Sequence, residues 1–139
     1  GDVYKRQAVK KDGTIYTPAQ GLMGKNLLAA GVKDTYNFGP VLIKDGEAQL
    51  PWAETEKYYP RTAVGMVKPN DYVLLVTDTG SYNGLNHWDM VNIFKSYGCT
   101  YAYNLDGGGS ATLYFNGKVM NKLIGNTQRP CADFLYFTR

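Results

Sequence analysis

The chain has 139 residues and a formal net charge of +3, which is the size of a single domain with a core of its own. With 44% hydrophobic and 19% charged residues, the composition excludes a disordered chain. The scattered basic residues give no footprint for a nucleic-acid polymer. The apolar stretches are only a few residues long, so no membrane partner is expected. The 16 glycines and 12 tyrosines favour tight turns and strands.

The first seven residues, GDVYKRQ, resemble a translated adaptor sequence. We therefore expect residues 1–7 to be a leader or junction segment and residues 8–139 to form the domain, with a genuine first strand as the alternative. No charged-then-apolar signal peptide is seen at this end. The compartment would be extracellular or the cell envelope if a parent protein carries a signal peptide, and the cytoplasm if a phage encodes it.

The first half of the domain predicts short strands, one helix and tight turns. Asp-Gly pairs at residues 12–13 and 45–46 are typical of hairpins. Residues 22–30 have a helical composition that stops at Gly31. The predicted strands here are 8–11, 14–16, 36–43 and 47–50, followed by a loop at 51–60.

The second half predicts a longer helix between strand hairpins. Asn86 is a fair N-cap for a helix over residues 87–97, with His87 on the surface at its start. The buried stripe of this helix is predicted at Trp88, Val91, Phe94 and Tyr97. Asn116-Gly117 is the strongest hairpin turn. The predicted strands are 62–67, 72–77, 99–104, 111–115, 118–120 and 132–137.

These elements predict an α+β fold, with a mixed, largely antiparallel sheet and two main helices packed on it. Two cysteines are too few for a disulfide framework. Cys99 and Cys131 each begin a predicted strand, so we expect buried thiols, with a disulfide as the alternative. The single histidine excludes a His-rich zinc site.

Residues 104–112, NLDGGGSAT, are the most informative stretch. Three consecutive glycines are tolerated where backbone approaches a ligand or adopts positive φ. Free N–H groups in such a turn form an anion-binding concavity, here flanked by Asp106 and Ser110. A flexible glycine hairpin is the alternative. The stretch lacks the lysine of a phosphate-binding P-loop and the following helix of a dinucleotide fold.

The run NLDGGGSATLYFNG at residues 104–117 resembles the signature of the phosphodiester glycosidase family. Further matching elements are FGPVL with DG at 38–46, RTAVG at 61–65, VTD at 76–78, NK at 121–122 and RP at 129–130. The resemblance covers about residues 20–139. It implies a hydrolase that cleaves a glycosidic bond in a sugar phosphodiester or related polysaccharide. Bacterial and phage members of this family are often labelled exopolysaccharide-biosynthesis proteins.

The chain also departs from the family pattern. No segment resembles the Asn-Gly-Gly-Phe-Phe-like strand at which the family domain usually begins, so we expect an N-terminal truncation or a piece supplied from elsewhere. The arginine usual after Asp78 is absent, Asp89 takes the place of a helical glutamate, and Leu123 takes the place of a proline. Two alternatives follow: a non-catalytic binder of an anionic sugar phosphate or nucleotide, and a structural module of cell-wall or phage assembly.

The resemblance implies that the leaving group is a phosphate monoester, which needs charge stabilisation more than a proton. Guanidinium groups suit phosphate oxygens, so Arg61 and Arg129 are candidates, with surface ion pairs as the alternative. The sugar C1 needs a carboxylate as nucleophile or base. Asp106 and Asp78 lie at predicted strand ends and can face one cleft; turn and loop capping are their alternatives.

The expected catalytic residues are Asp106, Asp78 and Arg61. The expected substrate-binding residues are Asn104, Gly107, Gly108, Gly109, Ser110, Arg129 and Asn121. Asn104 either bonds sugar hydroxyls or holds the glycine turn, and Asn121 either contacts ligand or caps a turn. Asp89 falls in a first helical turn, where an acidic residue is favoured in any case. The aromatic residues expected to stack on a ligand or to pack are Trp52, Tyr58, Tyr59 and Tyr82.

We expect no cofactor and no metal, although clustered aspartates have some affinity for Ca²⁺. The expected partner is a small molecule or glycan that bears phosphate. The oligomeric state stays open.

Overall fold

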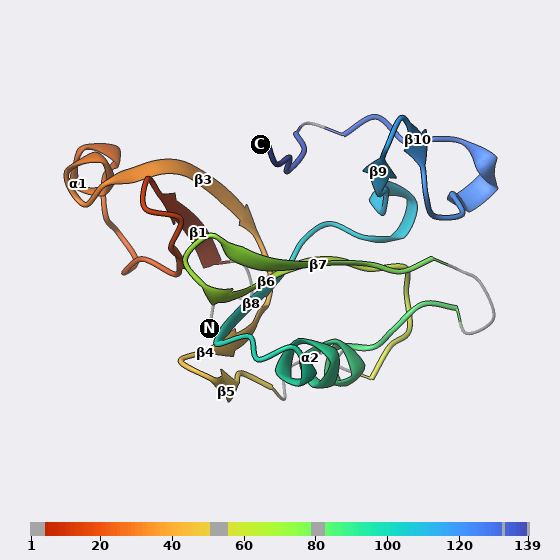
Figure 1. Cartoon of the computed structure of the whole chain (residues 1–139), viewed down its shortest axis with the longest axis horizontal. Helices are drawn as coiled ribbons and strands as arrows, with labels where there is room; N and C mark the ends of the chain where they lie inside the picture. The colour runs from red at the N-terminus through yellow and green to blue at the C-terminus, as the bar shows by residue number, and fades with distance from the viewer. Residues whose placement is uncertain (1–4, 51–55, 79–82, 132, 139) are drawn as a thin grey trace.

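The computed structural model describes residues 5–50, 56–78, 83–131 and 133–138 (Figure 1). Its central sheet has five strands in the order β5 (Glu47–Ala48), β4 (Val41–Lys44), β8 (Tyr101–Asn104), β6 (Thr62–Lys68) and β7 (Asp71–Val76). A second sheet has the order β2 (Ile15–Tyr16), β1 (Lys5–Lys10) and β3 (Val32–Phe38). The strands β9 (Tyr114–Phe115) and β10 (Lys118–Val119) form a separate hairpin.

Two α-helices complete the described fold: α1 (Gly24–Ala29) and α2 (His87–Ser96). Figure 1 shows α2 along one side of β6 and β8, with β1, β3 and α1 on the other side. The described strand pairs are all antiparallel. The predicted α+β class, with sheets and two main helices, is therefore confirmed. Neither helix in the described ranges is long and apolar enough to cross a bilayer.

The inner strands β6 and β8 of the central sheet are buried on both faces, and small and large side chains alternate along them. In β6, Ala63 belongs to the core under α2, whereas Val64 and Met66 face the second sheet. In β8, Ala102 faces α2 and Tyr103 faces the second sheet. The small residues let α2 approach closely, and the large ones fill the space between the sheets.

Gly65 in β6 sets the depth at which α2 lies on the sheet. A Cβ at this position would come within 2.5 Å of Phe94 Cδ1 and 2.7 Å of Cys99 Sγ. Real Cβ atoms essentially never show such contacts. Glycine is therefore required where the helix crosses the strand.

Helix α2 starts as predicted, and its buried stripe agrees with the prediction at Val91 and Phe94 but not at its ends. The Asn86 side chain caps its N-terminus by accepting from the Asp89 N–H at 2.9 Å. The residues of α2 that are buried are His87, Met90, Val91 and Phe94. Tyr97, expected in the stripe, is the C-cap residue and is 64% exposed. The buried face thus starts one residue earlier than predicted, because the sheet lies on that side of the helix.

The second sheet begins inside the segment expected to be a leader. β1 starts at Lys5, and Gln7 is fully buried. The predicted strand over 36–43 is two strands, because β3 ends at Phe38 and β4 follows a cis Gly39-Pro40 bond. The predicted strand over 99–104 is shorter, since β8 begins at Tyr101.

The C-terminal part of the described chain is irregular. Asn116 and Gly117 both have positive φ, which is the geometry of a two-residue hairpin turn and confirms that turn between β9 and β10. The predicted closing strand over 132–137 is wrong for its described residues, since 133–137 contain no strand. Phe134 is 83% exposed, and Phe137 contacts the Tyr72 ring at 5.5 Å between centroids. An apolar run forms a strand only where a partner edge accepts its hydrogen bonds.

Candidate functional site

The start of β6 and the ends of β7 and β8 lie side by side at one end of the central sheet. Because β6 is antiparallel to both neighbours, it starts where β7 and β8 end, and Thr62 pairs with Val76. Asp78 after β7 and Asp106 after β8 therefore emerge at the same edge, as does Arg61 before β6. Asp106 and Asp78 thus follow strand ends, as expected from the sequence.

The amides of the glycine turn after Asp106 are hydrogen-bonded within the protein. The N–H groups of Gly107, Gly108 and Ser110 donate to Asp106 Oδ1, Pro60 O and Gly107 O at 2.9 to 3.0 Å. A Cβ on Gly107 would lie 2.5 Å from Pro60 O, so the turn needs glycine where it packs on this carbonyl. The expected row of free N–H groups is therefore wrong for these three amides, because protein oxygens, including Pro60 O from another segment, already accept from them; the turn contains the short 3-10 helix η1 (Gly108–Ser110).

A carboxylate, a guanidinium and a hydroxyl come together beside this turn. Arg129 donates to Asp106 Oδ2 at 2.9 Å and also to Ser110 Oγ. The side chains of Arg129 and Asp106 are 55% and 51% exposed, so a ligand in solvent can reach both. The aliphatic part of Arg129 lies beside Gly109. Asp106, Ser110 and Arg129, all predicted as site residues, thus form one cluster, which we call the Asp106–Arg129 cluster.

Arg61 is buried and bonded to protein groups. Its guanidinium donates to Leu85 O at 3.0 Å and Lys57 O at 2.7 Å, and it contacts His87 Nε2 at 3.1 Å. It also lies 5.1 Å from the Tyr59 ring centroid, and the residue is 8% exposed. The structure therefore places Arg61 behind two loops rather than at the Asp106–Arg129 cluster.

His87 and the loops around it are part of this arrangement. The prediction that His87 lies on the surface is wrong, since it is 2% exposed and contacts the Arg61 guanidinium. Tyr59 and Leu85 form an isolated antiparallel bridge. A Cβ at Gly84 would come within 1.8 Å of Tyr59 O, so only glycine fits this crossing.

The two asparagines of the predicted site hold backbone. Asn104 Nδ2 donates to Gly39 O at 2.9 Å, and its buried Oδ1 has no hydrogen-bond partner among the described residues. Asn121 Oδ1 accepts from Leu113 N–H at 2.7 Å, and its Nδ2 donates to Ala111 O at 2.8 Å. Asn121 therefore fixes the segment that follows the glycine turn.

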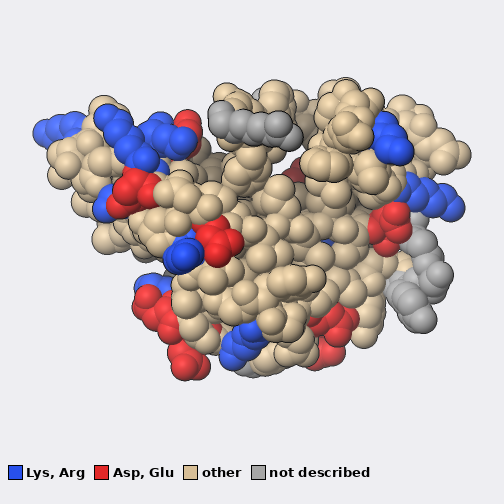
Figure 2. Space-filling view, viewed as in Figure 1, with Lys and Arg blue, Asp and Glu red and all other residues tan. Residues whose placement is uncertain are grey.

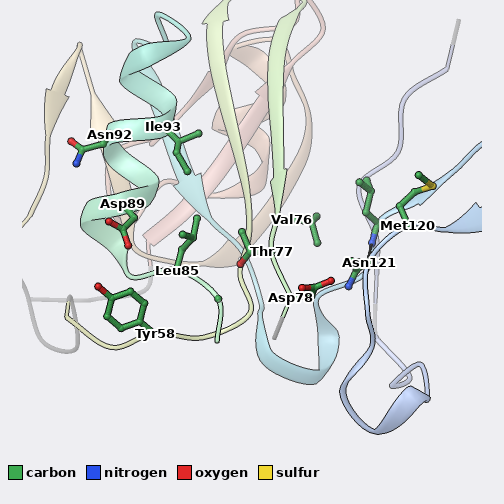
Figure 3. Close-up of a pocket in the computed structure, with 12 residues that line it drawn as sticks. Tyr58, Val76, Thr77, Asp78, Leu85, Asp89, Asn92, Ile93, Met120 and Asn121 are labelled. Atoms are coloured by element: carbon green, nitrogen blue, oxygen red, sulfur yellow. Dashed lines mark hydrogen bonds between the residues drawn. The ribbon is translucent and has the colours of Figure 1, made fainter. Parts of the chain in front are cut away.

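A pocket of about 840 Å³ opens next to this segment (Figure 3). Its lining comes from the end of β7, the start and middle of α2, and the residues around β10. The lining residues are Tyr58, Val76, Thr77, Asp78, Gly84, Leu85, Asp89, Asn92, Ile93, Leu113, Met120 and Asn121. Asp78, Asn121 and Tyr58 are thus brought into one pocket, which we call the α2 pocket.

Figure 3 shows two walls of the α2 pocket. Asp89, Asn92 and Tyr58 lie on the α2 side, and Asp78 lies with Asn121 on the other. Asp78 Oδ2 accepts from the Lys122 N–H at 2.7 Å. The sequence analysis missed Asn92, although its spacing of three from Asp89 places both on one helix face.

Charges are distributed unevenly between the two features. Among the described residues that line it, the α2 pocket has two carboxylates, Asp78 and Asp89, and no lysine or arginine. The Asp106–Arg129 cluster contains the guanidinium. Over the face shown in Figure 2, acidic and basic side chains are intermixed around a broad uncharged area.

The two cysteines differ in environment. Cys99 is buried, and this burial raises the pKa of its thiol. Cys131 is exposed, so the expectation of a second buried thiol is wrong, because the segment around it does not pack as a strand. Both thiols are free, and the alternative of a disulfide between them is not realised.

Some expectations fall on positions that the structure does not describe. Trp52, Tyr82 and the position after Gly80, where the family arginine would stand, lie outside the described residues. Within the described ranges, no group of three or more His, Cys, Asp or Glu side chains is placed to hold a metal ion.

Comparison with known proteins supplies the family. The model of the phosphodiester glycosidase family matches residues 2–138. The chain belongs to the phosphodiester glycosidase family. The matched range includes the glycine turn, both features of the site and β1. The chain therefore carries family sequence along nearly its whole length.

Its relatives include phage-derived and animal proteins. It is 33% identical over 115 residues to a prophage-derived protein of Bacillus subtilis, a match that covers 78% of this chain and 18% of that protein. It is 41% identical over 58 residues to the N-acetylglucosamine-1-phosphodiester alpha-N-acetylglucosaminidase of Mus musculus, covering 41% of this chain and 11% of the mouse protein. The chain therefore spans about a fifth or less of the length of these relatives.

Solved structures show the same fold. The catalytic domain of the zebrafish N-acetylglucosamine-1-phosphodiester alpha-N-acetylglucosaminidase, auto-inhibited by its pro-peptide, superposes with a TM-score of 0.69 at 25% identity. That match covers 86% of this chain and 44% of the zebrafish chain. A protein from Synechocystis shares the fold with a TM-score of 0.51 at 17% identity, covering 86% of this chain and 31% of that one.

Proposed function

We propose that this chain hydrolyses the glycosidic bond of a sugar phosphodiester or a related polysaccharide. The observation that carries the proposal is the Asp106–Arg129 cluster, in which a carboxylate, a guanidinium and the Ser110 hydroxyl meet at a solvent-accessible strand end. Membership of the phosphodiester glycosidase family supports it. So does the likeness to the catalytic domain of the zebrafish N-acetylglucosamine-1-phosphodiester alpha-N-acetylglucosaminidase.

Each group in the cluster has a role in this chemistry. Arg129 and Ser110 bind the phosphate oxygens and stabilise the charge that develops as the phosphate monoester leaves. Asp106 acts at the sugar C1, as nucleophile or as base for water, where an oxocarbenium-like state develops. Arg61 is a positioning residue that does not contact the substrate. Its hydrogen bonds to Lys57 O and Leu85 O hold the loops that line the α2 pocket. This differs from the role expected for Arg61 from the sequence.

The proposal is tested by turnover of sugar 1-phosphodiesters with aryl and nucleotide leaving groups. Release of the free sugar and of the phosphate monoester is followed by chromatography. Asp106→Asn is expected to lower the rate by at least about 100-fold. The matched control is Asp34→Asn, which removes an exposed carboxylate from β3 in the second sheet and leaves the rate unchanged.

A non-catalytic binder is the second candidate. It is favoured by the Asp106 carboxylate being already paired with Arg129 at 2.9 Å. Retention of a sugar phosphate without any release of sugar, abolished by Arg129→Ala, would support this binder over the hydrolase. If the protein neither cleaves nor retains a sugar phosphate, both candidates are contradicted and a structural module is favoured.

A further inference from the structure

We propose that the α2 pocket is a glycan subsite that takes uncharged or amino-bearing sugar units and discriminates against acidic ones. The inference rests on the proposed function, because it assigns the pocket to the glycan side of the same substrate. The Asp106–Arg129 cluster then takes the phosphate. The α2 pocket carries carboxylates, whereas the Asp106–Arg129 cluster carries a guanidinium. A short backbone segment, residues 110–113, joins the two.

The size and surface of the pocket suit a carbohydrate. Its volume of about 840 Å³ lies in the range of sites that enclose organic ligands. Val76, Leu85 and Ile93 provide apolar surface for the C–H faces of sugar rings. Tyr58 stands at the wall with 53% of its surface exposed, so its ring is free for a sugar to stack on.

The polar groups of the pocket match sugar hydroxyls. The α2 wall presents the Asp89 carboxylate and the Asn92 amide one helical turn apart. A carboxylate accepts hydrogen bonds, and an amide both accepts and donates. A sugar hydroxyl can satisfy either, because it is donor and acceptor at once. The same pair bonds an ammonium group of an amino sugar.

The charge of the pocket sets its selectivity. Asp78 and Asp89 are its charged lining residues, and both are acidic. A uronic acid or phosphorylated sugar in the pocket would meet like charge, and none of the lining residues that the structure describes is a lysine or arginine that could offset it. An ammonium group would be attracted. Uncharged sugars are accepted without either effect.

The pocket is linked to the phosphate-binding cluster through Asn121. This residue lines the pocket and donates to Ala111 O at 2.8 Å. Ala111 directly follows Ser110, which accepts from Arg129. One backbone segment, residues 110–113, thus borders both features, so a substrate can place its phosphate at Arg129 and extend its glycan along α2.

Binding of three trisaccharides to the full chain tests the assignment. N-acetylchitotriose is uncharged, chitotriose carries amino groups, and trigalacturonic acid carries carboxylates. Affinities are measured by isothermal titration calorimetry at low and high salt. We expect N-acetylchitotriose and chitotriose to bind, and trigalacturonic acid to bind at least about tenfold more weakly at low salt, with the difference shrinking as salt screens the charges.

Two variants with matched controls locate the binding. Tyr58→Ala is expected to weaken the binding of both accepted trisaccharides at least about fivefold. Tyr97→Ala, which removes another exposed tyrosine at the end of α2, leaves it unchanged. Asp89→Asn reduces the preference for chitotriose over trigalacturonic acid, whereas Asp34→Asn does not. Because Tyr58 is exposed, its variant reports on the pocket even if Asp89→Asn loosens α2.

The outcomes separate this inference from the proposed function. No binding of any trisaccharide, equal binding of trigalacturonic acid, or insensitivity to Tyr58→Ala overturns the glycan subsite. Turnover of sugar phosphodiesters alongside such a result leaves the hydrolase proposal in place. Trisaccharide binding without turnover supports the subsite and contradicts the hydrolase instead.

Discussion

The carboxylate of Asp106 accepts a hydrogen bond from the guanidinium of Arg129 at 2.9 Å, although 23 residues separate them in the sequence. The contact brings the chain beyond η2 (Ile124–Asn126) back to the end of β8. The second acceptor of the Arg129 guanidinium, Ser110 Oγ, lies in the same turn as Asp106. Residues from two distant segments therefore have to assemble before the cluster exists.

Arg129→Lys is expected to affect activity far more than stability. The ion pair is half exposed, and such pairs contribute about 1 kcal/mol or less to the free energy of unfolding. A lysine keeps the charge but lacks the planar guanidinium, whose Nη2 donates to both Asp106 Oδ2 and Ser110 Oγ. Urea unfolding and turnover of sugar phosphodiesters measure the two effects. A loss of several kcal/mol in stability would contradict a ligand-binding role.

Arg61→Ala is expected to destabilise the fold strongly. Its guanidinium contacts His87 at a buried position and donates to Lys57 O and Leu85 O at part-buried ones, so the substitution removes these contacts together with the packing of a residue that is only 8% exposed. We expect a decrease of about 2–4 kcal/mol in the free energy of unfolding, measured by urea titration. The control Arg6→Ala removes an exposed arginine with one bond to Leu22 O, and should change stability by about 0.5 kcal/mol or less.

Gly65→Ala is expected to lower the free energy of unfolding by about 1–3 kcal/mol. The added Cβ would stand 2.5 Å from the Phe94 ring and force α2 away from the sheet. Gly24→Ala is the matched control, because nothing lies within 4 Å of a Cβ at that helical position. It should leave stability unchanged or raise it by about 1 kcal/mol at most. Equal effects of the two substitutions would refute the close approach of α2.

Stability is expected to fall above about pH 10 as buried tyrosines lose their protons on unfolding. Burial raises the pKa of Tyr103 to about 12 from its ordinary value of 10.0, and burial also raises the pKa of Tyr101 and Tyr36. The unfolded chain therefore binds fewer protons than the folded one between about pH 10 and 12, so stability decreases with rising pH there.

Urea unfolding at a series of alkaline pH values measures this tyrosine effect. Tyr101→Phe, which removes a buried hydroxyl bonded to Thr17 Oγ1, should make the decrease shallower. Tyr97→Phe removes an exposed hydroxyl and should leave the slope unchanged. A flat profile for the wild type up to pH 12 would argue against three buried neutral phenols.

The two thiols are expected to react at different rates. Cys131 is exposed and should be alkylated by iodoacetamide in the folded protein, whereas Cys99 is buried with a raised pKa and should react only on unfolding. Mass spectrometry of peptides after timed alkylation distinguishes them. Comparable rates for both in native buffer would show that the β6–α2 core opens readily.

Elements governed by local signals were predicted well from the sequence. Asn86 caps α2, the hairpin of β6 and β7 lies within a residue of its predicted bounds, and Asn116-Gly117 adopts its expected positive φ values. Each of these depends on residues adjacent in the chain. The glycine turn was found for the same reason, and the family signature around it placed Asp106 and Ser110.

Features that depend on distant partners were not predictable in this way. The burial of His87 depends on Arg61, 26 positions earlier, and the internal bonding of the glycine turn depends on Pro60. The run at 133–137 has the composition of a strand, but no local signal reports whether an edge is available to it. Asn92 was missed because the existence of the α2 pocket depends on three segments that the sequence does not bring together.

The absence of a side chain at Gly65 has a consequence for engineering this molecule. It fixes how deeply α2 lies on the sheet, and α2 is also a wall of the pocket through Asp89 and Asn92. Any residue larger than glycine would shift that wall as well as strain the core. A substitution at Gly65 would therefore change the width of the α2 pocket and the stability of the fold together. Ligand selectivity is better altered at Tyr58, which is exposed and lies outside this close contact.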